Sequence, residues 1–409
     1  MSTAAAFSID LVQWRRRALL VGLAATVVCI LGALVAPDGR AQFFRAYLAA
    51  YLFYLGIGLG GLVLTMIYHL TGGAWGFLVR RILEAQARTL PLLAVLFVPI
   101  ACGIGWLYLW ARPDAVRQDE TLEHARDYLN PDFFWMRMAV VFVLWILMAW
   151  TLDFWSRRLD RTGDWRFSAK ALQFSGFGLV IYGITIHFSA ADWIQSLQPG
   201  FHSSIFGPLL ATTQLLSALA FAVVVLADCV TRPPLGQVVS SKALNDLGSL
   251  LFTILILWAY MVWFQFMLIW IANLPVDVIW YLPRAEGGWQ WVAWAIFLLH
   301  FVVPFFLLLQ RVVKRNPRSL AAVGKLLLVM QLVFSYYQVM PAFRTGGIGD
   351  HWLDFFTPLA IGGFWLAAFL WQIERRPLLA VHDLNARVAA HARHLDDREL
   401  AREGIIAHG

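Results

Sequence analysis

The sequence predicts an all-α integral membrane protein, and two observations carry this prediction. Of the 409 residues, 60% are hydrophobic and only 14% are charged, whereas soluble domains are about half apolar and about a quarter charged. The second observation is a series of ten apolar runs along the chain. Each run has about the 20 residues that a helix needs to cross roughly 30 Å of hydrocarbon.

The ten runs predict ten transmembrane helices in one domain. They lie at residues 18–36, 43–68, 89–111, 133–153, 168–190, 204–228, 247–272, 289–310, 319–340 and 352–373. No polar segment of domain size separates them, so we expect residues 1–376 to form a single transmembrane domain. Residues 377–409 are rich in charge and predict a cytoplasmic C-terminal tail.

The distribution of basic residues predicts the orientation of the spans. Alternate loops are rich in arginine and lysine, and the basic residues are Arg80, Arg81 and Arg88 after the second run, Arg157, Arg158, Arg161 and Arg166 after the fourth, Arg311, Lys314, Arg315 and Arg318 after the eighth, and Arg375 and Arg376 after the tenth. The opposite loops are poorer in basic residues, and the longest, 112–132, is net acidic. Basic loops face the cytoplasm, so both termini are expected there. The net charge of +7 follows from this anchoring and requires no nucleic-acid partner.

The cysteines limit the redox chemistry that the chain can perform by itself. Cys29, Cys102 and Cys229 are isolated, and the sequence contains neither a C-x-x-C-H haem motif nor an iron–sulfur spacing. Redox chemistry would therefore use a diffusing ligand or the centres of another subunit, and we expect no metal site in this chain.

Polar residues inside the spans are candidates for a proton path. A polar side chain in hydrocarbon costs free energy unless it has a partner, so it is expected to face the bundle interior. At about 100° per residue, two spans carry their polar residues along one side. These residues are Asp246, Ser249, Thr253 and Tyr260 in the seventh span, and Gln331, Ser335 and Gln338 in the ninth.

Three further proton-path candidates are histidines or acids at other depths. His300 lies near the middle of the eighth span, four residues before Pro304, and an imidazole there can relay protons. His69 and Asp153 lie at cytoplasmic span ends. The two stripes and His300 between them would suit a route made of two half-channels. The alternative is that these side chains pair between helices and only hold the bundle together.

The outer face supplies the residue types of a quinol site. Such a site needs an apolar, aromatic slot, a histidine or tyrosine, and a carboxylate that takes a proton. The candidates are Arg137, His187, Asp192, Trp193, Asn273 and Asp277. The alternative is a set of polar loop ends that pair among themselves.

Three stretches carry a resemblance to a known family. They are ADWIQSLQPGFHSSIFG (191–207), WAYMVWFQFMLIWIANLPVDVIWYLPRAEGGW (258–289) and HFVVPFFLLLQRVVKRNPRSLAAV (300–323). Together they resemble the NrfD-like (polysulfide reductase C-type) membrane subunits, and in particular the F subunits (ActF) of alternative complex III, a bacterial quinol:electron-acceptor oxidoreductase. The chain departs from the family pattern at Gln195, Phe201 and Val276, where the family has methionine, tryptophan and glutamate.

The resemblance implies a fold of two four-helix bundles, spans 2–5 and 6–9, flanked by spans 1 and 10. It implies a respiratory-chain subunit of the bacterial inner membrane that supports quinol oxidation at the periplasmic side and proton translocation. The quinol would be menaquinol or ubiquinol, with haem and iron–sulfur clusters only in partner subunits. Those partners would be a homologous membrane subunit (ActC-like), an iron–sulfur subunit, c-type cytochromes and a terminal oxidase. Catalysis would be shared with, or located in, these partners.

Two other functions fit ten spans with polar stripes. One is an ion- or proton-coupled secondary transporter, although the sequence shows no pair of Gly/Pro-interrupted spans in corresponding halves. The other is a purely structural membrane anchor of a redox complex, in which every buried polar group is satisfied inside the bundle.

Overall fold

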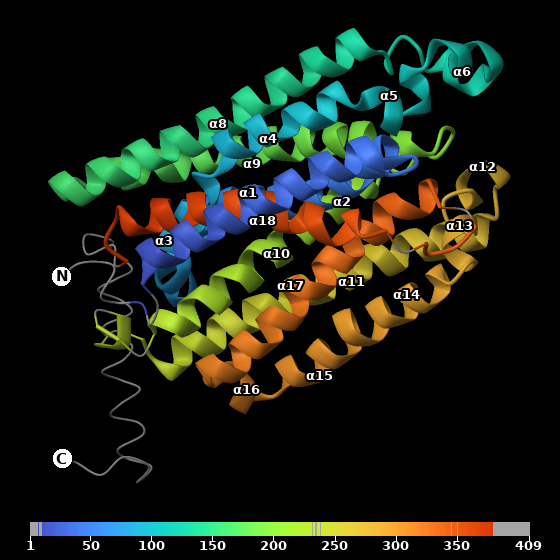
Figure 1. Ribbon diagram of the computed structural model, residues 1–409. Helices are drawn as coiled ribbons and strands as arrows, with labels where there is room; N and C mark the ends of the chain where they lie inside the picture. The colour runs from blue at the N-terminus through green and yellow to red at the C-terminus, as the bar shows by residue number, and fades with distance from the viewer. Residues whose placement is uncertain are drawn as a thin grey trace.

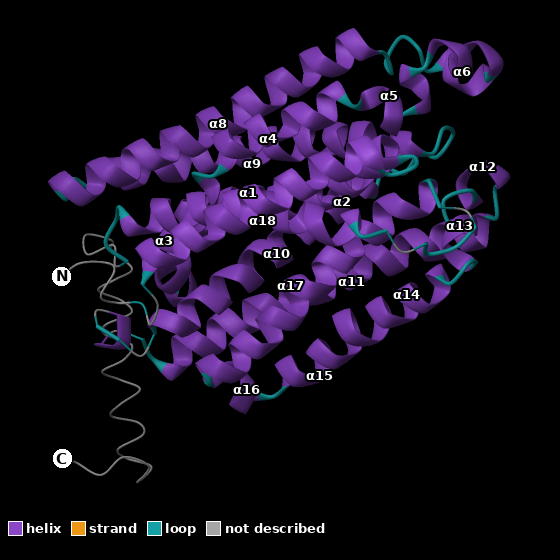
Figure 2. Cartoon of the chain, in the orientation of Figure 1, coloured by secondary structure: helices purple, strands orange, loops and turns teal. Residues whose placement is uncertain are grey.

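The structure is a computed structural model in which residues 7, 10–230, 232–233, 235–237, 239–344, 346–349 and 351–378 are described. This part of the chain consists of helices and loops and contains no β-strand (Figure 2). The long helices are α1 (Leu11–Val35), α2 (Gly39–Thr71), α3 (Ala74–Ala87), α4 (Leu90–Cys102), α8 (Pro131–Thr162), α9 (Arg166–Trp193), α10 (Phe206–Cys229), α11 (Ser241–Ala272), α17 (Pro317–Val339) and α18 (Leu353–Glu374). One more span is divided into α14 (Trp289–Ala295), a π-helical turn (Ile296–Val302) and α15 (Val303–Leu309). The short helices are α5 (Ile104–Leu107), α6 (Pro113–Gln118), α7 (Glu120–His124), α12 (Pro275–Val278), α13 (Leu282–Ala285) and α16 (Arg311–Arg315), with 3-10 turns at Leu109–Ala111, Gln195–Leu197, Leu235–Gln237 and Met340–Ala342.

The described helices have the length and composition of membrane spans. Nine of them, with Trp289–Leu309 taken as one, are long and apolar enough to cross a membrane. α3 and α4 meet the same criterion as a pair bent by 41°, which would make ten. The prediction of an all-helical protein of the membrane-spanning type is confirmed. The predicted tail lies, from residue 379 onward, outside the described residues.

The predicted third span, 89–111, begins close to α4 at Leu90, but α3 precedes it as part of the same bent pair. The chain is already helical from Ala74, and the bend between α3 and α4 falls at residues 88–89. Pro91, in the first turn of α4, contributes to the bend, because it has no backbone N–H with which to continue the hydrogen bonds of α3. As a consequence Arg80 and Arg81, which were expected in a loop, lie inside α3 and are buried.

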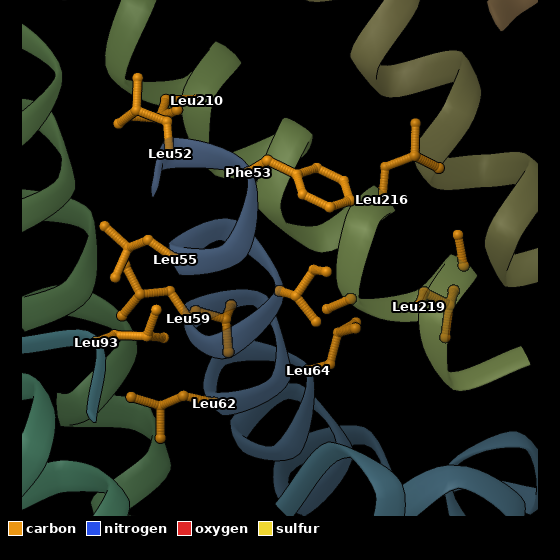
Figure 3. Close-up of a cluster of buried hydrophobic side chains, with 14 of the residues drawn as sticks. Leu52, Phe53, Leu55, Leu59, Leu62, Leu64, Leu93, Leu210, Leu216 and Leu219 are labelled. Carbon is orange, nitrogen blue, oxygen red and sulfur yellow. The ribbon is translucent and has the colours of Figure 1, made fainter. Parts of the chain in front are cut away.

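Helices α2 and α10 pack against each other at the centre of the molecule. α9 and α17 each contact both of them, α3 and α4 contact α2, and α11 contacts α10. α1 and α18 lie side by side along α2 (Figure 1). Leucines fill the interior between α2, α4 and α10, among them Leu59, Leu93 and Leu216 (Figure 3). The loop-end cleft and the interior polar groups described below are therefore built on one continuous core.

The two ends of the bundle differ in character (Figure 1). At one end, which we call the loop end, lie the connections 103–130, 194–205, 273–288 and 343–352. At the other, the arginine end, α1 begins and α18 ends, and Arg15 pairs with Glu374 at 2.7 Å.

The small-residue face of α2 permits a close approach of two backbones. A Cβ atom on Gly60 would lie 2.1 Å from the carbonyl oxygen of Gln214 on α10. Gly56, Gly58, Gly60 and Gly61 make up this face, which is therefore a packing surface.

Replacement of Gly60 tests this contact. Gly60→Ala forces the α10 backbone away, so we expect the free energy of unfolding to fall by about 1–3 kcal/mol. The matched control is Gly183→Ala on α9, where no atom lies within 4 Å of the added Cβ. Thermal unfolding in one detergent should show a lower midpoint for Gly60→Ala and an unchanged midpoint for Gly183→Ala. Equal midpoints would contradict the close packing.

Candidate functional site at the loop end

Arg137 and Asp192 form a buried ion pair at the loop end. Arg137 lies near the start of α8 and Asp192 at the end of α9. The guanidinium donates to both carboxylate oxygens, with Nε–Oδ2 and Nη2–Oδ1 distances of 2.9 Å each. Its Cζ atom also lies 4.0 Å from the ring centroid of Tyr128 and 4.3 Å from that of Phe133. Asp192 is fully buried, so Arg137 takes the place of solvent as the partner of its carboxylate.

A cleft of about 710 Å³ opens beside this ion pair. Segments 120–129 and 191–202 line it, the first from the loop between α4 and α8 and the second from the end of α9 and the loop that follows. Leucine, alanine, proline and phenylalanine supply its apolar walls, and its polar side chains include Glu120, His124, Tyr128, Gln195, Gln198 and His202. Its volume lies within the roughly 300–1,000 Å³ of small-ligand sites.

Tyr128 connects the cleft to the ion pair. Its ring stacks on Arg137, and its buried hydroxyl interacts with the Asp192 carboxylate. Burial, and to a lesser extent the negative charge of Asp192, raise the pKa of the Tyr128 phenol. The hydroxyl therefore stays protonated at neutral pH and remains a hydrogen-bond donor.

Of the six predicted quinol-site residues, the structure brings only Arg137 and Asp192 into direct contact by hydrogen bonds. Trp193 is fully buried, and its indole N–H donates to Met138 Sδ at 2.9 Å. It packs in an aromatic cluster with Phe97 and Trp145, so its role here is packing.

The remaining three predicted residues lie elsewhere at the loop end. His187 is on the exposed face of α9 and packs against Gly207, at which a Cβ would lie 2.7 Å from Nδ1. Asn273 is exposed and ends α11 in a left-handed conformation, with φ of 46°, which asparagine tolerates better than most residues. Asp277 is half-buried in α12. None of the three lines the cleft.

None of the six predicted residues lines the cleft itself, and Glu120, His124 and Tyr128 are among the lining residues that the prediction missed. They lie in the loop that the sequence marked only as net acidic. A signal existed, since Glu120 and His124 are four residues apart and therefore share one face of a helical turn. The structure places both in α7, with His124 Nδ1 at 2.7 Å from the Glu120 carbonyl oxygen.

Arg284 connects the loop 273–288 to the end of α17. It is buried, lies over the Trp280 ring at 3.5 Å, and donates to the carbonyl of Gln338 at 2.8 Å and to that of Tyr337 at 3.3 Å. A cation is favourable there, because the last carbonyls of a helix are unpaired and carry the negative end of its dipole. Burial lowers the pKa of Arg284 to about 9, so the side chain remains charged at neutral pH.

His300 and the ninth-span stripe face the interior, as predicted. His300, Gln331, Ser335 and Gln338 are all buried. The His300 ring centroid lies 4.0 Å from that of Trp258 on α11. His300 sits in the π-helical turn, whose hydrogen bonds join each carbonyl to the amide five residues on and so bypass the missing amide of Pro304.

The seventh-span stripe does not face the interior as a whole. Thr253 is exposed, and its hydroxyl donates to the Ser249 carbonyl of its own helix. Tyr260 is 52% exposed, and Asp246 is half-buried. The rotation of α11 is set by its apolar face, because Leu247, Leu251, Leu255 and Trp258 are the side chains that it buries. The prediction that this stripe faces the bundle interior is therefore wrong for Thr253 and Tyr260.

His69 and Asp153 lie at the arginine end. Asp153 is buried and pairs with Arg88 at 3.1 Å, with Arg157 at 2.8 Å and with Arg376. His69 is half-buried at the end of α2. This end therefore holds ion pairs that fix α3, α8 and the end of α18 to one another.

The fold and these groups define the class of protein: an all-helical protein of the membrane-spanning type with a polar cleft at one end. In the described part of the chain, no three His, Cys, Asp or Glu side chains are arranged to hold a metal ion. Comparison with models of protein families and with curated proteins gives no match.

Substitution of Asp192 tests how much the buried ion pair contributes to stability. Asp192→Asn leaves the Arg137 charge buried without its partner, which costs about 3–5 kcal/mol. We expect the unfolding midpoint to fall strongly, and to recover in part in the double variant Asp192→Asn/Arg137→Gln, which also removes the orphaned charge. Asp127→Asn, at an exposed acid of the same loop end, is the control. An Asp192→Asn variant as stable as the control would contradict the pairing.

Proposed function

We propose that this chain is the membrane subunit of a quinol:electron-acceptor oxidoreductase of the alternative complex III type. In this proposal the loop end faces the periplasm of a bacterial inner membrane and the ten spans place both termini in the cytoplasm. The loop-end cleft beside the Asp192–Arg137 pair is the observation that carries the proposal. The resemblance of residues 191–207, 258–289 and 300–323 to the F subunits of that complex supports it.

The residues of the cleft suit a hydroquinone. Its apolar walls accept an aromatic ring, and in the proposal the Tyr128 hydroxyl donates to a ring oxygen. A quinol releases two protons when it is oxidised, and His124 and His202 at the cleft are residues of the type that most often accepts them. Asp192 acts as a positioning residue, because it holds the Arg137 guanidinium, which lies over the Tyr128 ring.

In the proposal the electrons leave through partner subunits, because the sequence contains neither a C-x-x-C-H haem motif nor an iron–sulfur spacing. In the proposal an iron–sulfur subunit and c-type cytochromes lie against the loop end, and a homologous membrane subunit lies alongside in the bilayer. The positive-inside rule supports this orientation, since most basic loops belong to the arginine end. Proton translocation is the second part of the proposal, and the buried His300 on a polar interior supports it.

Purification of the native assembly tests the complex. Extraction of the tagged chain in a mild detergent should recover haem- and iron–sulfur-bearing partners in fixed ratio, as read by absorption spectra and mass spectrometry. Recovery of the chain by itself, under conditions that keep a known respiratory complex intact, would refute the assignment.

Tyr128→Phe tests the cleft with the removal of a single oxygen. Loss of one hydrogen bond to the substrate costs about 1–2 kcal/mol, so quinol turnover by the intact complex should fall about five- to thirtyfold. Tyr260→Phe removes the same atom from a tyrosine on the outer surface of α11 and should leave turnover unchanged. Equal turnover in both variants, at equal complex content, would exclude the cleft as the quinol site.

A further inference from the structure

The interior around α11, the π-helical turn and α17 contains polar atoms that the chain does not satisfy. Among the described residues, seven buried side-chain atoms there have no hydrogen-bond partner, and they are Trp258 Nε1, Gln265 Oε1, His300 Nδ1 and Nε2, Gln331 Nε2 and Oε1, and Gln338 Nε2. All five side chains are at most 4% exposed. Three separate helical segments contribute them, so the group is a property of the bundle and not of one helix.

These side chains form a column. Trp258 and Gln265 are seven residues apart on α11, and Gln331 and Gln338 are seven apart on α17, so each pair lies on one face about 10 Å in length. Ring contacts join the faces: Trp258 lies 4.0 Å from His300 and 5.1 Å from Phe334, which follows Gln331 by one turn of α17.

Seven buried polar atoms without partners would cost too much free energy if no water were bound to them. Each buried donor or acceptor without a partner costs about 1–3 kcal/mol, and the sum would approach or exceed the roughly 5–15 kcal/mol by which a typical protein is stable. A ligand small enough to reach donors and acceptors on three helices, and to serve both kinds, is water. Buried waters typically bridge three such groups.

The column of polar groups continues toward only one end of the bundle. Toward the loop end it continues from Gln338 to Arg284, which donates to the Gln338 carbonyl at 2.8 Å, and from there to Gln198 at 3.4 Å from the guanidinium. Toward the arginine end the next turns are apolar. There Leu251, Leu255, Leu308 and Leu327 are fully buried and offer no hydrogen bonds.

We propose that Trp258, Gln265, His300, Gln331 and Gln338 line a chain of ordered waters that exchanges with the loop end alone and stops at His300. The waters keep His300 in proton exchange with one side of the membrane, and the leucine layer closes the other side. The inference concerns hydration and sidedness. It does not rest on quinol binding and survives if the proposed function fails.

Radical footprinting of the unaltered protein tests the hydration. Radiolysis of bound water generates hydroxyl radicals that oxidise adjacent side chains. Trp258 and Trp145 are equally buried, at 2% and 0% exposure, but the Trp145 indole donates to Thr185 at 2.9 Å while that of Trp258 has no protein partner. We expect Trp258 to be oxidised several-fold faster than Trp145, as measured by mass spectrometry. Equal rates would overturn the proposal.

Silver-ion accessibility tests the sidedness. In a variant in which Cys29, Cys102 and Cys229 are replaced by alanine, single cysteines are introduced as Gln338→Cys, Gln331→Cys and Leu327→Cys, and the protein is reconstituted in vesicles. Ag⁺ added to one side blocks a wetted thiol from later alkylation. His202→Cys and Arg318→Cys, at the exposed loop end and arginine end respectively, report orientation and folding.

The proposal expects Gln338→Cys and Gln331→Cys to react from the loop-end side only, and Leu327→Cys from neither side. Two results would overturn it. In one, neither column cysteine reacts although both reporters do, which means that the groups are dry. In the other, Leu327→Cys or Gln331→Cys reacts from the arginine end, which means that the column runs through. Neither measurement contains quinol, so these outcomes are separate from those of the Tyr128 experiment.

Discussion

A polar group inside a membrane-spanning bundle needs a hydrogen-bond partner, because hydrocarbon offers none, and the halves of this chain meet that need in different ways. Around α8, α9 and α10 the partners are protein side chains. Arg137 pairs with Asp192, and Tyr182 donates to Gln214 at 2.7 Å. Around α11 and α17 the polar side chains meet aromatic rings, and Trp258 against His300 is the closest such contact. In the first region protein residues pair most of these groups, whereas in the second we propose that water does so.

The fold could be predicted from the sequence to the extent that hydrophobic length decides it. Apolar runs of about 20 residues have few alternatives to helices in a membrane, so the helical class and most spans were recovered. The bend before Pro91 was missed because Arg80 and Arg81, which precede it, suggested a loop, whereas they pair with Glu84 at 2.9 and 2.8 Å and remain in the interior. The sequence pattern shows that the arginines are charged, but it does not show the acidic partner that makes their burial possible.

The candidate site was predictable only in its residue types. The sequence placed acids, histidines and aromatics at the loop end, but Arg137 and Asp192 are 55 residues apart, and periodicity within one helix cannot join them. The face of α11 was misjudged for a related reason. A period of 100° groups Ser249, Thr253 and Tyr260 on one side, but which side turns inward depends on the packing of leucines, and that is a property of the assembled bundle.

The π-helical turn that contains His300 determines where its imidazole lies in the polar column. A regular α-helix would leave the His300 carbonyl opposite Pro304, which has no amide hydrogen, and the π-helical register avoids this loss. The same turn carries an imidazole to a fully buried position against Trp258. Water that hydrogen-bonds to this imidazole would conduct protons through the membrane if the column continued. The buried leucines beyond it, Leu251 and Leu327 among them, therefore allow a wet interior to coexist with a barrier that ions do not cross.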